Sequence, residues 1–372
     1  MPSILFITNY PAPYRVEFFN QLGERAELTV LFSDRPEEQT HRSIEWFQNQ
    51  YSSFTAVFLK KKSIAGIHVC ADVLHHLKKR YDLVILGGYS TATQMLAIEY
   101  LSIHRIPFYI EADGGLIKPD SFITHTIKKH FISSASGYFS SGEITDRYFE
   151  HYNGKQSKPI FRFPFSSLTE KEIINNKKEA SSPSSKKDHR AELGINEETV
   201  LLSVGQMIPR KGFDILLDAA RDLPDNIGIY IVGGKPTLEL EKIKKEDNLK
   251  NVHFIDFQIK EVLAKYYLAA DVFVLPTRED IWGLVINEAL SYGLPVISSD
   301  MCGAALELVK DRGTGCLFPS QSSADLHNAI IQLLNSDMDK MKDLCFDLSR
   351  SYTIEKMVDA HLKAIDSISG AN

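Results

Sequence analysis

Length, composition and charge narrow the class of protein before any motif is considered. The chain has 372 residues, of which 44% are hydrophobic and 24% are charged, a globular composition long enough for two domains. Its formal net charge of −6 argues against a protein whose main partner is nucleic acid, because surfaces that follow phosphates need an excess of Lys and Arg.

Cysteine usage and apolar segments exclude further classes. The four cysteines are widely spaced and include no CxxC pair, so neither a zinc site nor a disulfide framework is indicated, and a reducing cytoplasm is the simplest compartment. The first segment, MPSILFITNYPAPYR, turns polar after one short apolar run and does not resemble a signal peptide. No segment approaches the roughly 18 uninterrupted apolar residues of a membrane span. Any contact with a membrane is therefore expected from its surface.

The first part of the chain alternates short apolar runs with longer segments of helical period. It opens with ILFIT, YRVEFFNQL and ELTVLF and continues through DLVILGG, TATQMLAIEYL, IPFYI, FITHTIKKHFI and GYFSS. Strands separated by helices are typical of right-handed βαβ units, which form a parallel sheet covered on both faces. We therefore predict a doubly wound, Rossmann-like domain over residues 1–170.

A polar segment precedes a second alternation of the same kind. Residues 171–196 include NNKKEASSPSSKKDHR, whose Lys- and Ser-rich composition predicts a flexible linker or exposed loop. TVLLSVG, FDILLDAA, IGIYIVGG and DVFVLP then indicate a second doubly wound domain over residues 197–350. The last helical segment, in residues 351–372, is long enough to cross back to the first domain.

The loop GQMIPRKGF follows the first strand of the second domain. Ligands of open parallel sheets bind outside the carboxyl ends of the strands, so such loops are the places to look for a site. Gly205 leaves the backbone room to turn, while Arg210 and Lys211 place cations just before a helix whose N–H groups also attract anions. A diphosphate would use all of these features. Taken alone, this loop is explained better by a solvated basic turn.

The stretch REDIWGLVINEALSYGLPVI follows the strand DVFVLP. The helix is expected to begin near Gly283, so the amides of Gly283 and Leu284 suit a phosphate. Glu288 lies about one turn further on and is placed to accept hydrogen bonds from neutral hydroxyls such as those of a ribose. Asp280 would do the same for a sugar beyond the phosphates. Both acids are also explained as favourable charges at a helix start, but the cationic loop in the same domain favours a ligand.

These two loops resemble a known family, the retaining nucleotide-sugar glycosyltransferases of family four, which have the GT-B fold. Members carry a G-R-x4-K-G loop and an E-x7-E element, and GQMIPRKG and DIWGLVINE have the same spacing and order. EALSYGLPVIS is also similar to the family's EAMACGTPVIAS. The resemblance covers most of the second domain. It implies an α/β fold of two doubly wound Rossmann-like domains facing a central cleft.

The resemblance also implies roles for individual residues. Lys211 would contact the donor diphosphate, Glu288 the ribose and Asp280 the sugar hydroxyls. The implied donor-binding set consists of Gly205, Gln206, Arg210, Lys211, Trp282, Gly283, Leu284 and Glu288. Two positions depart from the family pattern. Gln206 replaces the usual Arg, a loss for which Arg210 would compensate, and Asp280 replaces the first Glu and shortens its reach by one methylene.

The first domain resembles the family more loosely. NYPAPYRVEFF stands where many members have a Gly-rich loop, and we expect Tyr10, Tyr14 and Arg15 to shape an acceptor pocket instead. EADGG stands where members often have a His near the donor sugar. Asp113 takes that place and is expected to line the cleft with Glu111 and to contact donor or acceptor hydroxyls. An acidic turn shaped by the two following glycines is the alternative.

Together these features imply transfer of a hexosyl unit, with retention of configuration, from a UDP- or GDP-linked donor to a saccharide or lipid-linked saccharide. Such enzymes serve bacterial cell-surface polysaccharide or glycan synthesis. The candidate catalytic residues are Lys211, Asp280 and Asp113. The sequence predicts no metal site and no cofactor besides the donor substrate, because no cluster of acids has metal-ligand spacing.

Two other functions remain open, and so does the acceptor. The chain fits a GT-B sugar-nucleotide epimerase, or a non-catalytic nucleotide-sugar-binding protein in view of Gln206 and Asp113. The helical segment FITHTIKKHFI mixes aromatic, apolar and basic residues, as interfacial helices do. A cytoplasmic protein that meets a lipid-linked acceptor at the inner face of the cytoplasmic membrane is therefore a hypothesis.

Overall fold

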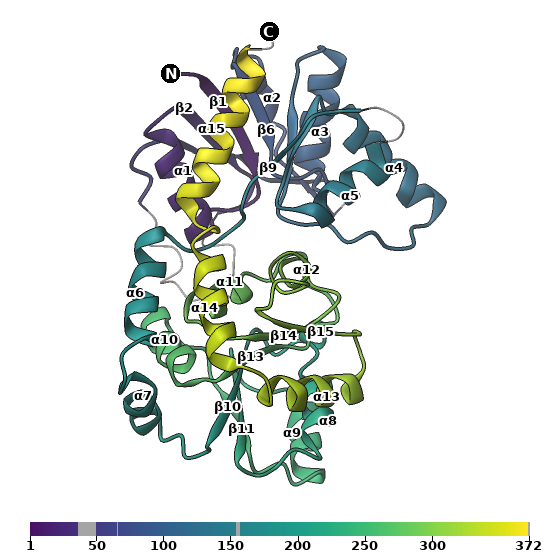
Figure 1. Ribbon diagram of the computed structural model, residues 1–372. Coiled ribbons are helices and arrows are strands. Elements are labelled where there is room, and N and C mark those ends of the chain that lie inside the picture. Colours follow the sequence, from purple (N-terminus) through teal and green to yellow (C-terminus); the bar gives the residue numbers. More distant parts are fainter. Residues whose placement is uncertain (36–49, 65, 154–156, 371–372) are drawn as a thin grey trace. The chain divides into compact units, whose positions relative to one another are not determined.

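The computed structural model describes residues 1–35, 50–64, 66–153 and 157–370 (Figure 1). The chain divides into two compact units, one formed by Met1–Ser167 with Thr353–Asn372 and the other by Leu168–Tyr352. Each unit has its own parallel sheet and its own hydrophobic core.

Within the described residues, the first unit is built on a seven-stranded parallel sheet in the order β3-β2-β1-β6-β7-β8-β9. Its strands are β1 (Ser3–Thr8), β2 (Glu27–Phe32), β3 (Thr55–Phe58), β6 (Leu83–Leu86), β7 (Tyr109–Ala112), β8 (Gly137–Ser140) and β9 (Ile160–Arg162). The four middle residues of β1 are buried, because a continuous apolar run in a parallel sheet is covered on both faces.

The helices of the first unit include one from the far end of the chain. They are α1 (Pro13–Gly23), α2 (Val73–Leu77), α3 (Ala92–Ile103), α4 (Phe122–Ser134), α5 (Glu143–Asn153) and α15 (Ile354–Gly370), and a short antiparallel pair, β4 (Lys62–Ile64) and β5 (Ile67–Val69), accompanies them. α15 packs against α1 and β9 (Figure 1). Its buried residues recur at helical spacing, from Ile354, Met357 and Val358 to His361 and Ile365, so one stripe of the helix faces the core.

The second unit has a six-stranded parallel sheet within the described residues, in the order β12-β11-β10-β13-β14-β15. Its strands are β10 (Thr199–Val204), β11 (Ile227–Val232), β12 (Val252–Ile255), β13 (Val272–Leu275), β14 (Val296–Ser299) and β15 (Gly315–Phe318). Its helices are α6 (Glu170–Ala180), α7 (Ser185–Leu193), the 3-10 helix η3 (Pro209–Lys211), α8 (Phe213–Ala220), α9 (Leu238–Glu246), α10 (Lys260–Ala269), α11 (Leu284–Ser291), α12 (Gly303–Leu308), α13 (Ser323–Leu334) and α14 (Met338–Ser349).

The predicted flexible linker over residues 171–196 is wrong, because most of that segment is helical and belongs to the second unit. α6 begins at a capping box in which the Thr169 hydroxyl accepts from the Glu172 amide and the Glu172 carboxylate accepts from the Thr169 amide. Only Ile173 of this helix is buried. Its two isoleucines are adjacent, and a pair at i, i+1 leaves no helical stripe in the sequence from which a helix could be recognised.

α7 is held mainly by polar contacts. Arg190 donates to the carbonyl of Ala269 at 2.9 Å and forms an ion pair with Asp271 at 2.5 Å, just before β13. Gly194, in the left-handed conformation with φ of 68°, ends the helix. The Lys- and Ser-rich composition therefore gave no sign of this helix, because its contacts with the rest of the unit depend on charge rather than on apolar burial.

Both sheets reverse their strand order next to the first strand of the unit. In the first unit β1 lies between β2 and β6, and in the second unit β10 lies between β11 and β13. Such reversal points open a crevice at the carboxyl ends of the strands, where ligands of this architecture bind. The prediction of two doubly wound, Rossmann-like α/β domains is confirmed, and it places the loops after β10 and β13 side by side.

Candidate active site

The loop after β10 runs from Gly205 to Gly212, and a glycine stands at each end. A β-carbon at Gly205 would lie 3.3 Å from the side chain of Lys211, which packs across this position. Gly212 has a φ of +68°, and a β-carbon there would lie 2.1 Å from the carbonyl oxygen of Pro276. Glycine therefore lets this loop fold directly against the residues that follow β13.

The loops after β10 and β13 are also tied together by hydrogen bonds. The Arg278 amide donates to the Arg210 carbonyl at 2.8 Å, and the Thr277 hydroxyl lies 3.0 Å from the same oxygen. The Arg278 guanidinium grips both carboxylate oxygens of Asp214, at 2.8 and 2.5 Å, and donates to the Pro209 carbonyl at 2.7 Å. A two-pronged ion pair of this kind fixes direction as well as distance, so the two loops form one rigid platform.

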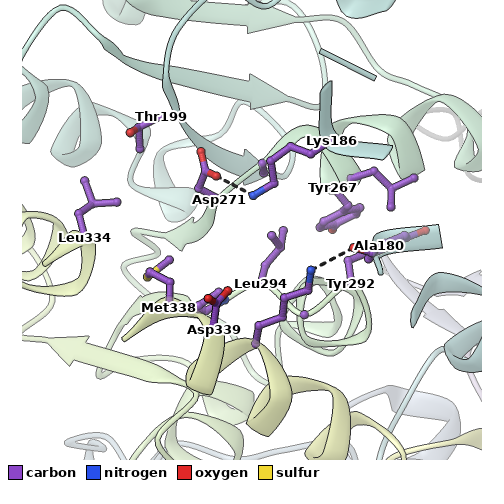
Figure 2. A pocket seen from close by; sticks show the side chains of 15 residues that line it. Ala180, Lys186, Thr199, Tyr267, Asp271, Tyr292, Leu294, Leu334, Met338 and Asp339 are labelled. Atoms are coloured by element: carbon purple, nitrogen blue, oxygen red, sulfur yellow. Dashed lines mark hydrogen bonds and ion pairs between the residues drawn. The ribbon is translucent and has the colours of Figure 1, made fainter. Parts of the chain in front are cut away.

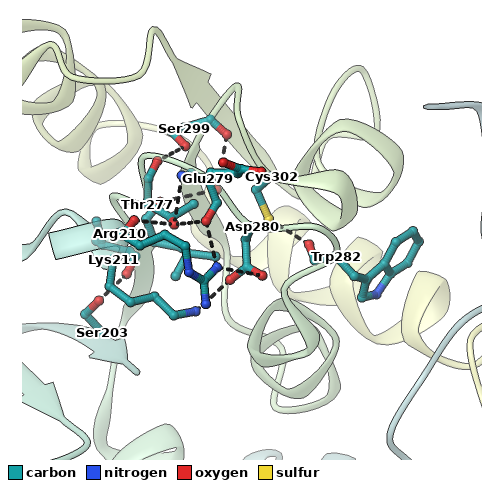
Figure 3. Close-up of polar contacts among 12 residues, drawn as sticks. Ser203, Arg210, Lys211, Thr277, Glu279, Asp280, Trp282, Ser299 and Cys302 are labelled. Atoms are coloured by element: carbon teal, nitrogen blue, oxygen red, sulfur yellow. Dashed lines mark hydrogen bonds and ion pairs between the residues drawn. The ribbon is translucent and has the colours of Figure 1, made fainter. Parts of the chain in front are cut away.

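Two cations converge on one carboxylate at this platform (Figure 3). Lys211 Nζ lies 2.6 Å from Asp280 Oδ2, and Arg210 Nη1 lies 3.6 Å from Asp280 Oδ1. The side chains of Lys211 and Asp280 are 11% and 14% exposed. The backbone of Asp280 is held by a hydrogen bond from its amide to the Met301 carbonyl at 2.8 Å. Preorganised charge in a largely dry setting acts more strongly on a ligand than charge in water.

α11 begins beside Asp280. Gly283, its N-cap, has a φ of +99°, and a β-carbon there would lie 2.7 Å from Cys302 Sγ and 3.8 Å from the carboxyl carbon of Asp280. The first amides of any helix lack partners within that helix, so those after Gly283 can donate to an anion. Trp282 is buried and donates from Nε1 to Asn287 Oδ1 at 2.9 Å. Its ring therefore supports the start of α11 from within the core.

Glu288 lies further along α11 and is held by a tyrosine that the sequence did not single out. Its Oε2 accepts from the hydroxyl of Tyr267, on α10, at 2.9 Å. Burial raises the pKa of the Glu288 carboxyl, and the hydrogen bond from Tyr267 only partly offsets this rise. Tyr267 in turn stacks on Tyr292, with ring centroids 5.1 Å apart and planes at 4°. Nothing in the sequence around Tyr267 signals this role, because the pairing depends on how α10 packs.

The same two tyrosines line a cavity of about 290 Å³ (Figure 2). Its other lining residues include Thr199, Asp271 and Pro295, which stand at the amino ends of β10, β13 and β14. The cavity therefore lies at the edge of the sheet opposite to the Lys211 platform. It contains none of the residues that the sequence predicted for a site.

In the first unit, Asp113 follows β7 and belongs to a cluster of charged side chains. Arg15 Nη1, on α1, lies 2.6 Å from Glu111 Oε1 and 3.9 Å from Asp113 Oδ1. Glu111 Oε2 lies 2.8 Å from Nε2 of His361, on α15. Burial would raise the pKa of Glu111, but the charges of Arg15 and His361 outweigh it and lower that pKa. The pKa of Asp113 is raised to about 6, first by loss of water, with a further contribution from the charge of Glu111.

The predicted acceptor-side residues do not all face outward. Tyr10 and Tyr14 are partly exposed, and the Tyr14 ring packs edge-on against Phe165 with centroids 5.8 Å apart. Arg15 is buried instead, so any part that it has in shaping an acceptor pocket is played from within the core. The guanidinium points into the core because Glu111, a buried carboxylate on β7, is its ion-pair partner.

The second unit thus brings most of the predicted donor-binding residues together. Arg210, Lys211 and Asp280 meet beside the start of α11, whereas Gln206 is exposed and Trp282 is buried beneath the helix. Five residues of these clusters carry no motif in the sequence and were not predicted: Thr277, Arg278 and Asp214, which join the two loops, and Tyr267 and His361. Arg278 is the first residue of the stretch REDIWGLVINEALSYGLPVI and Thr277 precedes it, so their place after a strand was the one available signal.

The described residues contain neither a cluster of metal-ligating side chains nor a helix that could cross a membrane. No group of three or more His, Cys, Asp or Glu side chains in that part of the chain is arranged to hold a metal ion. None of the helices in the described ranges combines the length and the apolar character needed to cross a membrane.

Sequence comparison relates the second unit to a known family. The family model described as "Glycosyl transferases group 1" matches residues 185–345. The D-inositol 3-phosphate glycosyltransferase of Mycobacteroides abscessus is 34% identical over 161 residues, which are 41% of this chain and 36% of that protein. The lipopolysaccharide glucosyltransferase WaaG of Escherichia coli is 28% identical over 156 residues, 40% of this chain and 41% of WaaG. These matches thus span well under half of each relative's length.

Longer matches come from another sequence and from solved structures. An uncharacterized glycosyltransferase of Methanocaldococcus jannaschii is 25% identical over 310 residues, 79% of this chain and 84% of that protein. HepE of Anabaena, solved with UDP and glucose, aligns with a TM-score of 0.73 and 18% identity over 99% of this chain and 100% of HepE. WaaG aligns with a TM-score of 0.67 and 18% identity over 99% and 100% of the two chains. The chain therefore has the GT-B fold, and residues 185–345 match the model of group 1 glycosyl transferases.

Proposed function

We propose that this protein is a glycosyltransferase that moves a hexosyl unit from a nucleoside-diphosphate sugar to a saccharide or lipid-linked saccharide. Transfer proceeds with retention of configuration and without a metal ion, in the synthesis of a cell-surface polysaccharide or glycan. The observation that carries the proposal is the meeting of Lys211, Arg210 and Asp280 beside the amino end of α11, in a domain of the group 1 family.

The chemistry of this group suits a leaving diphosphate. As the bond to the sugar breaks, negative charge grows on the phosphate oxygens, and fixed cations and helix amides stabilise that charge without reorganising. Lys211 is the principal cation, because it is largely enclosed, and the more exposed Arg210 adds a second charge. Together they supply the positive charge that a metal ion would otherwise provide.

The two carboxylates bind neutral parts of the donor. Asp280 accepts hydrogen bonds from hydroxyls of the transferred sugar once the diphosphate draws Lys211 toward itself. Glu288 accepts from the ribose hydroxyls, with Tyr267 fixing the orientation of its carboxylate. UDP is the first nucleotide to test, because structures of HepE contain UDP and UDP-glucose, and GDP is the alternative.

The first unit provides the residues proposed for the acceptor side and for contact with sugar hydroxyls. Asp113 stands after β7 with a side chain that is 38% exposed, so it is available to hydroxyls of donor or acceptor. Tyr10 and Tyr14 offer partly exposed rings for a saccharide. Arg15 is not proposed to contact the substrate directly. It is instead an ion-pair partner of Asp113.

The surface of α4 supports a lipid-linked acceptor met at the inner face of the cytoplasmic membrane. Phe122 and Ile123 are 86% and 70% exposed, and Ile127 and Ile117 are exposed nearby. Residues 116–134 hold three lysines, two histidines and one aspartate in a chain of net charge −6. Apolar side chains beside local positive charge suit the interface of a membrane with anionic lipids.

Vesicle flotation tests the membrane contact separately from catalysis. The unchanged protein is expected to float with vesicles of phosphatidylglycerol and phosphatidylcholine and to float less with phosphatidylcholine alone. The double substitution Phe122→Ser with Ile123→Ser should abolish flotation, whereas Leu238→Ser, which changes an equally exposed side chain of the second unit, should not. Equal flotation of all three proteins would show that α4 does not mediate the membrane contact.

Release of nucleotide tests the catalytic proposal. The protein is incubated with UDP- and GDP-sugars, with and without EDTA, and free UDP or GDP is measured. Lys211→Ala should reduce release about 100- to 1,000-fold, the usual effect of removing one charge-stabilising donor. Lys242→Ala, which removes an exposed lysine on α9, should have no effect. An epimerised donor without free nucleotide would indicate an epimerase, and binding without turnover a non-catalytic protein.

A further inference from the structure

A chain of buried charges links the last helix of the protein to Asp113. His361, on α15, contacts Glu111, on β7, which contacts Arg15, on α1, and Arg15 faces Asp113. The side chains of His361, Glu111 and Arg15 are 0%, 1% and 6% exposed. Asp113, whose side chain is 38% exposed, is the only one of the four that is not buried.

The hydrogen-bond partners of His361 define the protonation state of its ring. Its Nδ1 lies 2.8 Å from the carbonyl oxygen of Met357, and its Nε2 lies 2.8 Å from the carboxylate of Glu111. A carbonyl oxygen only accepts, and an ionised carboxylate only accepts. With Glu111 ionised, both ring nitrogens must therefore donate, and His361 is a cation. It stacks on Phe139, with centroids 4.8 Å apart and planes at 7°, which fixes its orientation.

The charges in this cluster balance only when Asp113 is included. Arg15 and His361 are then two cations, and Glu111 is one buried anion between them. The Arg15 guanidinium is enclosed by the rings of Phe6, Phe18 and Phe19, each 5.1 Å from its central carbon. Uncompensated charge in such surroundings is costly, so the cluster attracts the Asp113 carboxylate as its fourth member.

A core that served stability alone would gain little from this arrangement. Replacing buried ion networks by apolar residues of similar volume is often neutral or stabilising. Here the buried network ends at one partly exposed carboxylate, at the carboxyl end of β7 where ligands of this architecture bind. Because this network of charged side chains runs from the core to the site, it points to a role in holding Asp113 in place.

We propose that Arg15, Glu111 and His361 are positioning residues, through which α15 fixes Asp113 for its contact with the sugar. This inference rests on the function proposed above, in which Asp113 meets a donor or acceptor hydroxyl. His361 orients Glu111, Glu111 holds the Arg15 guanidinium, and Arg15 sets where the Asp113 carboxylate stands. The segment that closes the sequence thus shapes a site more than 240 residues earlier in the chain.

Hydrogen exchange measured by mass spectrometry tests the mechanical link without any substrate. His361→Phe keeps a ring on Phe139 but removes both donors, and amides of residues 109–116 should then exchange about tenfold faster. Ile365→Ala, a buried change on the same helix outside the cluster, should leave residues 109–116 unchanged. Unchanged exchange in both variants would overturn the inference. If His361→Phe does not fold, His361→Gln, which retains one donor, replaces it.

A double-mutant cycle tests the catalytic consequence. In release of UDP from the donor that the protein turns over, His361→Phe should lower kcat about tenfold with little change in KM, and it should have no further effect in an Asp113→Asn background. Equal losses in both backgrounds would mean that His361 does not act through Asp113. If the unchanged protein turns over no nucleotide sugar, the proposed function fails, and hydrogen exchange alone then decides whether the link exists.

Discussion

The ion pair between Lys211 and Asp280 predicts that removing a negative charge from the site improves nucleotide binding. Asp280→Asn should bind UDP more tightly than the unchanged protein, although it should transfer sugar more slowly. Asp280 competes with the diphosphate for Lys211, and its own charge repels the phosphates. Substitution by Asn keeps the shape of the side chain and removes both effects. Transfer is slowed because an amide accepts hydrogen bonds from sugar hydroxyls less strongly than a carboxylate does.

The size of the gain follows from the geometry of the pair. At an effective dielectric constant of about 20, unit charges 2.6 Å apart attract by roughly 6 kcal/mol. Loss of water around side chains that are 11% and 14% exposed offsets most of this attraction. We take about 1.5 to 3 kcal/mol as the remainder, the range of hydrogen bonds to charged groups. UDP affinity should therefore rise about 10- to 150-fold.

Isothermal titration calorimetry with UDP measures this gain directly. Lys211→Ala should weaken binding, and Asp280→Asn should bring a smaller gain in the Lys211→Ala background, because the competition is then absent and only the repulsion of the phosphates is relieved. Asp225→Asn, at an exposed acid near the amino end of β11, controls for the change in net charge. If Asp280→Asn weakens UDP binding as much as Lys211→Ala does, Asp280 does not compete for Lys211 and the reasoning is refuted.

Two further predictions concern the carboxylate of Glu288 and the turn at Gly212. Burial raises the pKa of Glu288, and ribose hydroxyls donate to its ionised form, so affinity for uridine should fall as the pH drops through this raised value. Calorimetry should show that step in the unchanged protein and none in Glu288→Gln; a step that persists in the variant would assign it to another group. Gly212→Ala should lower the free energy of unfolding by at least about 2 kcal/mol more than Gly194→Ala, because both positions have a φ of +68° but only Gly212 lies against a carbonyl oxygen. Urea denaturation compares the two, and equal losses would show that the contact with Pro276 is unimportant.

Local features of the sequence identified the strands and the donor loops. Runs such as ILFIT and TVLLSVG are apolar throughout because parallel strands are buried on both faces, and they became β1 and β10. Lys211 and Asp280 are 69 residues apart, yet each follows a strand, and carboxyl ends of parallel strands share one edge of the sheet. The position of each residue relative to its strand was therefore enough to group them.

Most of the residue roles that were not predicted depend on contacts between elements that are distant in the sequence. Arg15 looked like a ligand contact because a cation in a loop-to-helix turn is usually exposed, and its buried partner Glu111 is close only in the folded sheet. His361 and Tyr267 carry no local signal, since their roles arise from the packing of α15 and α10. The prediction of a flexible linker over residues 171–196 was wrong for another reason. The helices of this segment are held by caps and ion pairs, which leave little apolar pattern in the sequence.

The central claim is that Lys211 and its neighbours stabilise the diphosphate leaving group of a nucleotide sugar. ³¹P and ¹H NMR of UDP-glucose and related donors, incubated with the unchanged protein and with Lys211→Ala, tests it most directly. We expect free nucleoside diphosphate, and a transferred or released sugar whose first-formed anomer keeps the donor's configuration, with Lys211→Ala almost inactive. Equal turnover by both proteins, or a donor returned only as its epimer, would contradict it.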